Sequence, residues 1–271
     1  MSIKLMYITN RTQVALIAEK SGVDRIFIDM EYIGKAERQC GMDTVKSHHT
    51  VEDVKNIRGV LRDAELLVRC NAIYEGSKDE IDAIVDAGAD IVMLPYFKTV
   101  DEVKTFLGII GGRVKTCLLV ETPGAVDAID EILALDGIDE VQIGINDLSL
   151  GYGKKFLFEE LADGMVDYIC SKVKEKGIPY GFGGIASLGR GRLTSEYVIM
   201  EHYRLGSTRA ILSRSFCNTE NMHDLQAIKT VFVNGVKAIR EYEEYCRTHP
   251  ELWENNQKEA AEIIMQIAAG G

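Results

Sequence analysis

The amino-acid sequence predicts an α/β fold, a single (β/α)8 barrel. Short apolar runs rich in β-branched residues recur along the chain, and helical patterns with apolar residues at three- and four-residue spacing lie between them. The runs are almost continuously apolar, which is typical of parallel strands covered on both faces. Eight such units in about 215 residues match the usual length of one barrel, and no linker interrupts them.

The eight expected strands are short and evenly distributed. They span residues 4–9, 25–30, 65–70, 91–95, 115–121, 140–144, 179–184 and 210–215. Several of the helical patterns between them end in a glycine that we expect to be a left-handed C-cap, at Gly22, Gly88, Gly137, Gly177 and Gly206. A doubly wound open sheet is the alternative fold, but residues 8–17 lack the glycine-rich turn that its dinucleotide-binding form carries.

Two segments depart from the barrel pattern, which we assign to residues 1–249. The first is a long insertion after the second strand, over residues 33–50. The second is a C-terminal helical extension over residues 250–271, which is mildly amphipathic. We expect this extension to pack against the barrel or against a second subunit.

The composition argues against several classes of partner. The chain has 31 basic and 42 acidic residues, a formal net charge of −11, which disfavours nucleic acid and anionic membrane surfaces. No apolar run reaches the roughly 20 residues of a membrane helix, and the N-terminal residues lack the apolar core of a signal peptide. The six cysteines are widely spaced without a CxxC motif, which indicates reduced cysteines in a cytoplasmic protein.

Two carboxylates, Glu121 and Asp147, follow apolar strands. Glu121 closes the run KTCLLVE, and Asp147 lies in the turn INDLS after the next strand, EVQIG. Burying an unpaired charge costs several kcal/mol, roughly, so such positions need a partner. Two carboxylates at matching ends of successive strands suggest a divalent cation, Mg²⁺ or Mn²⁺ and also Co²⁺. A helix N-cap is the simpler interpretation of Asp147 alone.

Other polar residues and glycines also stand at the expected C-terminal strand ends, where barrel active sites lie. They include Asp29, Glu31, Arg69, Asn146, Gly183, Gly184, Ser213 and Arg214. Arg69 can bind a carboxylate or phosphate as a fork, or can pair with Asp29 or Glu31. Together these residues describe a site for a 2-oxo acid, with the metal on its keto and carboxylate oxygens and Arg69 on the developing enolate.

Four segments resemble the HpcH/HpaI aldolase and citrate-lyase family of metal-dependent barrels. They are RIFIDMEY, LLVRCNAIYEGSKDEIDAIVDAGADIVMLPYF, LLVETPGAVDAIDEILALDGIDEVQIGINDLSLGYG and GFGGIA, and the similarity runs from about residue 26 to 216. The resemblance implies that Glu121 and Asp147 are the metal ligands and that Arg69 steadies the enolate. Family members join pyruvate or oxaloacetate enolates to an aldehyde or thioester, or release them, and usually form trimers or hexamers.

The sequence departs from the family at one position. The aldolases carry Asp-x-Glu-His at the end of strand 2, whereas this chain has Tyr32 in place of the histidine, and Asp86 matches the position of the histidine's aspartate partner. Tyr32 could act as the acid/base if its pKa were lowered far below about 10. Alternatively, His48 or His49 of the insertion could replace the histidine. The site could also run decarboxylation or an acyl-lyase step instead of an aldol reaction.

The sequence thus predicts a metal-dependent carbon–carbon lyase or aldolase that acts on a 2-oxo acid and an aldehyde or acyl partner, in a homo-oligomer. Phosphoenolpyruvate chemistry, as in a mutase, lyase or synthase, is one alternative. It would require a phosphate site, for which Arg190, Arg192 and Arg214 are candidates beside Ser213. The other alternative is a non-catalytic barrel that binds a metal together with an oxo acid.

Overall fold

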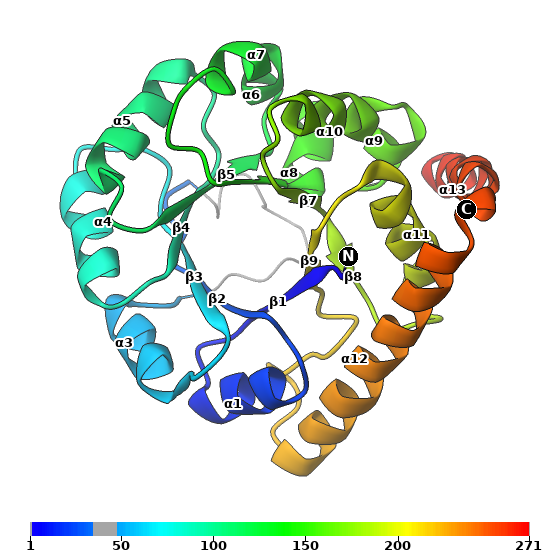
Figure 1. Cartoon of the computed structure of the whole chain (residues 1–271), viewed down its shortest axis with the longest axis horizontal. Helices are drawn as coiled ribbons and strands as arrows, with labels where there is room; N and C mark the ends of the chain where they lie inside the picture. The colour runs from blue at the N-terminus through cyan, green and yellow to red at the C-terminus, as the bar shows by residue number, and fades with distance from the viewer. Residues whose placement is uncertain (1, 35–47, 271) are drawn as a thin grey trace.

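The protein folds as a ring of parallel strands surrounded by helices (Figure 1). The computed structural model describes residues 2–34 and 48–270. The strands are β1 Lys4–Ile8, β2 Arg25–Asp29, β3 Glu65–Arg69, β4 Ile91–Leu94, β5 Lys115–Val120, β6 Glu140–Ile143, β7 Tyr180–Phe182, β8 Gly184–Ile185 and β9 Arg209–Leu212. They are hydrogen-bonded in the order β7-β6-β5-β4-β3-β2-β1-β9-β8. The nearly closed α/β barrel that the sequence predicts is therefore confirmed.

One predicted strand is divided in two. Residues 179–184 were expected to form a single strand, but β7 pairs with β6, and β8 pairs with β9. Gly183 stands between them with φ of +54°, in the left-handed region that breaks an extended strand. A Cβ atom on Gly181 would lie 2.3 Å from the carbonyl oxygen of Arg209. Strands β7 and β9 therefore approach each other too closely at this position for any residue other than glycine.

Helices follow most strands and form the outer layer (Figure 1). They are α1 Thr12–Lys20, α3 Val51–Val60, α4 Ser77–Asp86, α5 Val100–Ile110, α6 Pro123–Asp127, α7 Ile129–Ile132, α8 Ile145–Gly151, α9 Glu159–Ala162, α10 Met165–Glu175, α11 Ser195–Leu205, α12 Leu225–Thr248 and α13 Trp253–Ala268. Capping boxes start α3, at Thr50 and Asp53, and α5, at Thr99 and Glu102. The five glycines predicted as left-handed C-caps all have positive φ, between 67° and 96°.

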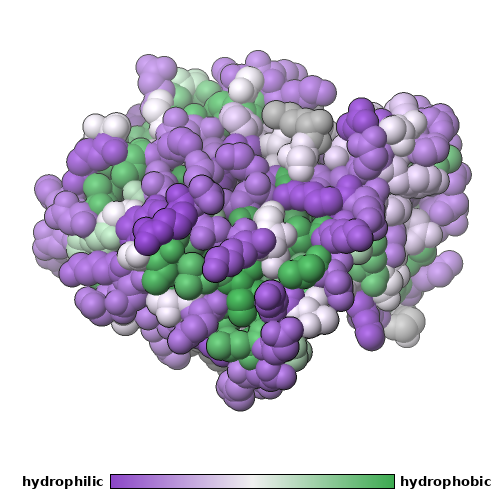
Figure 2. All heavy atoms as spheres, turned by 60° about the horizontal axis from the view of Figure 1, so that its bottom comes forward, coloured by the Kyte–Doolittle hydropathy of each residue, from purple (hydrophilic) through white to green (hydrophobic). Residues whose placement is uncertain are grey.

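The C-terminal extension packs against the barrel's own outer helices. Helix α13 lies against α9 and α11, where Ile264 is buried and Asn256 donates a hydrogen bond of 2.8 Å to Glu201. Hydrophilic side chains predominate on the face shown in Figure 2, with hydrophobic ones between them. In the described part of the chain, no helix is both long and apolar enough to cross a membrane.

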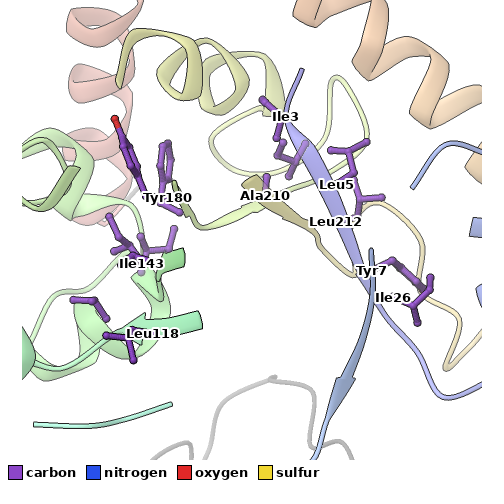
Figure 3. Close-up of a cluster of buried hydrophobic side chains, with 14 of the residues drawn as sticks. Ile3, Leu5, Tyr7, Ile26, Leu118, Ile143, Tyr180, Ala210 and Leu212 are labelled. Atoms are coloured by element: carbon purple, nitrogen blue, oxygen red, sulfur yellow. The ribbon is translucent and has the colours of Figure 1, made fainter. Parts of the chain in front are cut away.

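The main hydrophobic core fills the space between the strands and the helices (Figure 3). Leu5, Tyr7 and Ile26 belong to it, and their neighbours along the strands point the opposite way, into the barrel, because strand side chains alternate. The inward-pointing apolar residues form a second cluster, which we call the interior plug. It consists of Met6, Phe27, Leu67, Ile91, Met93, Cys117 and Leu119.

A buried ion cluster lies inside the barrel near the N-terminal ends of the strands. Arg25 donates to both carboxylate oxygens of Glu140, at 2.5 Å and 2.6 Å, and Arg209 does the same at 2.8 Å and 2.9 Å. Burial alone would raise the pKa of Glu140, but the hydrogen bonds from these two arginines outweigh it and lower that pKa. The plug and this cluster fill the interior toward the N-terminal ends of the strands, and the cavity described below lies at the other end.

Candidate active site

A cavity of about 460 Å³ opens at the C-terminal ends of the strands, above the interior plug. Its polar lining comes from residues that are far apart in the sequence, and several of them were expected at strand ends. They are Asp29, Arg69, Glu121, Gln142, Asn146, Asp147, Arg192, Ser195, Ser213 and Ser215. Because parallel strands end at the same rim, β2, β3, β5 and β9 bring such side chains together.

Glu121 directly follows β5 and is buried in the wall of this cavity. Its Oε1 accepts a hydrogen bond of 2.9 Å from the backbone N–H of Tyr96. Gly144, after β6, leaves space for the other oxygen, since a Cβ atom there would lie 2.7 Å from Oε2. Burial raises the pKa of Glu121 to about 8. The charge of Arg69 opposes this rise, while Asp147 and Glu31 add to it.

Asp147 lies in the first turn of α8, just beyond β6, and lines the same cavity. Its charge contributes to the raised pKa of Glu121, so the two carboxylates are close enough to repel each other. Among the described residues, no group of three or more histidine, cysteine or acidic side chains could hold a metal. Mg²⁺ commonly uses one or two carboxylates and fills its other positions with water and substrate, so the Glu121–Asp147 pair fits such an ion.

Arg69 ends β3 and is held by two buried carboxylates. Its Nε and Nη2 each donate to Asp29 at 2.9 Å, and its Nη1 lies 3.3 Å from Glu31. Burial would lower the pKa of Arg69, but the charges of Asp29 and Glu31 outweigh it and raise that pKa, so Arg69 stays positive. Three of its five N–H groups face these carboxylates, which leaves the guanidinium able to bind a substrate oxygen in the cavity.

His49 is the candidate acid/base that contacts the end of β2. Its Nδ1 accepts a hydrogen bond of 3.0 Å from the backbone N–H of Asp29, and its side chain is half-buried. His48 is exposed, Tyr32 is 61% exposed, and none of the three candidates is among the residues that line the cavity. His49 borders the cavity wall through its hydrogen bond with the backbone of Asp29.

The other predicted site residues divide into two groups. Asn146, Gly183, Gly184 and Ser213 line the cavity as expected. Asp86 does not line the cavity: it ends α4 on the outer surface, next to the loop that enters β4, and its catalytic role stays a prediction. Asp86 therefore lies at the opposite end of the barrel from His49, and the two cannot contact each other within one chain.

The proposed phosphate site is also divided. Arg192 lines the cavity, and its guanidinium carbon lies 5.4 Å from the ring centre of Phe156. Arg190 and Arg214 instead line a neighbouring hollow with Ser187. The structure thus does not gather the three arginines in one place.

Two features of the cavity were not predicted from the sequence. One is Gln142, whose position in the middle of the apolar run EVQIG was the available signal. The other is an apolar wall, formed by Ile145, Phe156, Leu157, Phe158, Leu193 and Val198. The loop over residues 156–158 carries no recognisable motif, so its approach to the cavity depends on the tertiary fold.

Comparison with known proteins assigns the fold and the site to a family. Residues 4–178 match the family model described as HpcH/HpaI aldolase/citrate lyase. The chain belongs to this family. It is an aldolase or lyase, as the resemblance of its segments implied, and its substrates are small molecules.

Named relatives of this HpcH/HpaI family chain are aldolases. A hydroxypyruvate/pyruvate aldolase of Sagittula stellata is 29% identical over 209 residues, which cover 64% of this chain and 74% of that protein. A 2-keto-3-deoxy-L-rhamnonate aldolase of Escherichia coli is 29% identical over 144 residues, which cover 41% of this chain and 54% of that protein. The crystal structure of an HpcH/HpaI aldolase from Desulfitobacterium hafniense superposes with a TM-score of 0.63 at 17% identity, covering 89% of this chain and 93% of that one.

Proposed function

We propose that this chain is a divalent-metal-dependent aldolase. It joins C3 of a 2-oxo acid, such as pyruvate or hydroxypyruvate, to the carbonyl carbon of an aldehyde, or reverses that step. In the forward direction C3 loses a proton to solvent, a bond forms between C3 and the aldehyde carbon, and the former aldehyde oxygen takes up a proton from solvent. The pairing of Glu121 and Asp147 beside Arg69 in one cavity carries this proposal.

The three charged groups have distinct roles in this reaction. Glu121 and Asp147 would hold Mg²⁺ or Mn²⁺, which when bound supplies Lewis-acid polarisation of the keto group. Arg69 offers its remaining N–H groups to the oxygen that gains charge as the C3 proton leaves. Asp29 and Glu31 fix the guanidinium in the orientation that this requires.

His49 is proposed to donate a hydrogen bond to the aldehyde oxygen. Since its Nδ1 accepts a hydrogen bond from Asp29, a neutral imidazole carries its proton on Nε2. That N–H group can donate a hydrogen bond to the aldehyde oxygen as the oxygen gains charge, while solvent supplies the proton that the oxygen finally takes up. This arrangement supplies a histidine to the end of β2, where Tyr32 stands in the family's histidine position.

The apolar wall is proposed to receive the aldehyde. Phe156, Leu157 and Phe158 lie on the cavity side formed by α8 and the loop after it, whereas Arg69 and Asp29 come from β3 and β2. An aldehyde with an apolar chain would bury that chain there, at a gain of about 0.8 kcal/mol per CH₂ group. We expect kcat/KM to rise along a series of aldehydes of increasing alkyl length; a flat series would contradict this placement.

Proton exchange at the methyl group of pyruvate tests the function without knowledge of the aldehyde. In D₂O with Mn²⁺, we expect the enzyme to replace the methyl protons with deuterium, as seen by NMR. Chelator should stop the exchange, and added Mn²⁺ should restore it. Exchange that is equally fast in excess chelator would refute the metal dependence, and no exchange with pyruvate or hydroxypyruvate would refute the proposed donor substrate.

A further inference from the structure

Gln142 is a buried amide without a hydrogen-bond partner, placed in the floor of the cavity. Its side chain is 1% exposed and lines the cavity, and among the described residues neither its Oε1 nor its Nε2 has a partner. Because both amide atoms lack a partner, this holds whichever way the amide group is flipped. Buried polar atoms are nearly always hydrogen-bonded, so two amide atoms without partners in a residue that lines the cavity indicate a polar group of a ligand.

Neither register partner of Gln142 on the neighbouring strands has a polar side chain. Gln142 lies opposite Leu119 in the register of β5 and β6, at the edge of the interior plug. On its other side, β7 presents Gly181, where a Cβ atom would lie 2.6 Å from the Gln142 oxygen. The amide thus fills a space that a side chain on β7 would otherwise occupy, and neither Leu119 nor Gly181 offers it a polar side-chain atom.

Gln142 lies deeper in the barrel than the charged residues at the C-terminal ends of the strands. Its register partner Leu119 precedes Glu121 by two residues, a rise of about 6.6 Å along the strand. Glu121, Asp147 and Arg69 at the rim already suit the carboxylate and keto oxygens of a 2-oxo acid. The part of the substrate that faces the floor is therefore the remaining carbon, C3, with its substituent.

The two unpartnered amide atoms, Oε1 and Nε2, determine which substituent on C3 of the substrate Gln142 can bind best. A methyl group, as in pyruvate, would satisfy neither atom, and a carbonyl or carboxylate oxygen only accepts, so it would satisfy Nε2 alone. A hydroxyl group both donates and accepts, so it can bond Oε1 and Nε2 together. We propose that Gln142 is a specificity-determining residue that binds a hydroxyl group on C3 of the 2-oxo acid and favours such a donor over pyruvate.

This inference rests on the proposed function, and donor competition tests it. The ratio of kcat/KM for hydroxypyruvate to that for pyruvate is measured with one aldehyde and Mn²⁺. In Gln142→Met, of similar volume, the ratio should fall at least about tenfold, because the loss of one of the two neutral hydrogen bonds already accounts for that factor. The melting temperature should rise because an unpartnered buried amide is gone. Gln142→Leu provides the same test should the methionine variant not fold.

The matched control is Leu119→Met, which changes the shape of the same floor without changing its polar atoms. It should alter turnover of both donors by the same factor and leave the ratio unchanged. A ratio in Gln142→Met within threefold of wild type, or an equal loss with both donors, would overturn the role of Gln142. Wild-type enzyme that turns over neither donor and exchanges no methyl protons would instead overturn the proposed function, and the inference with it.

Discussion

Gly144→Ala should displace Glu121 and little else. The added Cβ atom would lie 2.7 Å from Oε2 and 2.8 Å from Cβ of Glu121, whereas ordinary contacts begin at 3.4 Å. The carboxylate must therefore retreat by about 0.7 Å from its place beside Asp147. The φ of Gly144 is −88°, which alanine adopts readily, so the backbone itself is not strained. A misplacement of about 1 Å in an active site can cost roughly 100-fold in rate.

We expect kcat/KM of Gly144→Ala to fall about 100-fold, with more Mn²⁺ needed for half-maximal activity. Initial rates measured across a Mn²⁺ titration give both quantities. Gly108→Ala in α5 is the matched control, since no atom lies within 4 Å of the Cβ it would add, and its activity should equal that of wild type. A Gly144→Ala enzyme with wild-type kcat/KM and an unchanged Mn²⁺ requirement would refute the place given to Glu121.

Two further predictions concern stability. Glu140→Gln leaves Arg25 and Arg209 without their buried counter-charge and should lower the free energy of unfolding by about 3–5 kcal/mol in urea titrations; a loss below about 1 kcal/mol would contradict the ion cluster. Glu160 is fully buried, and burial raises its pKa from 4.5 to about 7, so the folded state binds more protons than the unfolded state between these pH values. Stability should therefore fall as pH rises from 4.5 to 7, by up to roughly 3 kcal/mol from this group, and Glu160→Gln should remove that part of the slope; identical slopes in both proteins would contradict it.

The fold and the charged rim of the cavity could be predicted because their signals are local. Apolar runs mark the strands, and parallel strands bring their C-terminal ends to one rim. Arg69, Glu121 and Asp147 therefore meet there, although Arg69 and Asp147 are 78 residues apart in the sequence. The division of β7 from β8 was missed because it depends on the left-handed φ of Gly183. No local pattern distinguishes this glycine from Gly181 and Gly184, whose φ values are not positive.

The other features that the sequence did not predict depend on contacts between residues far apart in the chain. Arg25 appeared as the first residue of an ordinary strand, yet its partner Glu140 lies 115 residues further on. Gln142 is one polar residue in an apolar run, and only the barrel shows that it points inward and lacks a partner. His49 could be named as a candidate, but its selection over His48 and Tyr32 required the bond to Asp29.

Diffraction from crystals grown with Mn²⁺ and pyruvate tests the central claim most directly. We predict one anomalous peak between Glu121 and Asp147, about 2.1 Å from an oxygen of each, with pyruvate beside it and one of its oxygens facing Arg69. The peak should vanish in Glu121→Gln crystals. A Mn²⁺ ion bound elsewhere in the cavity, or pyruvate bound without contact to Arg69, would contradict the assignment of these three residues.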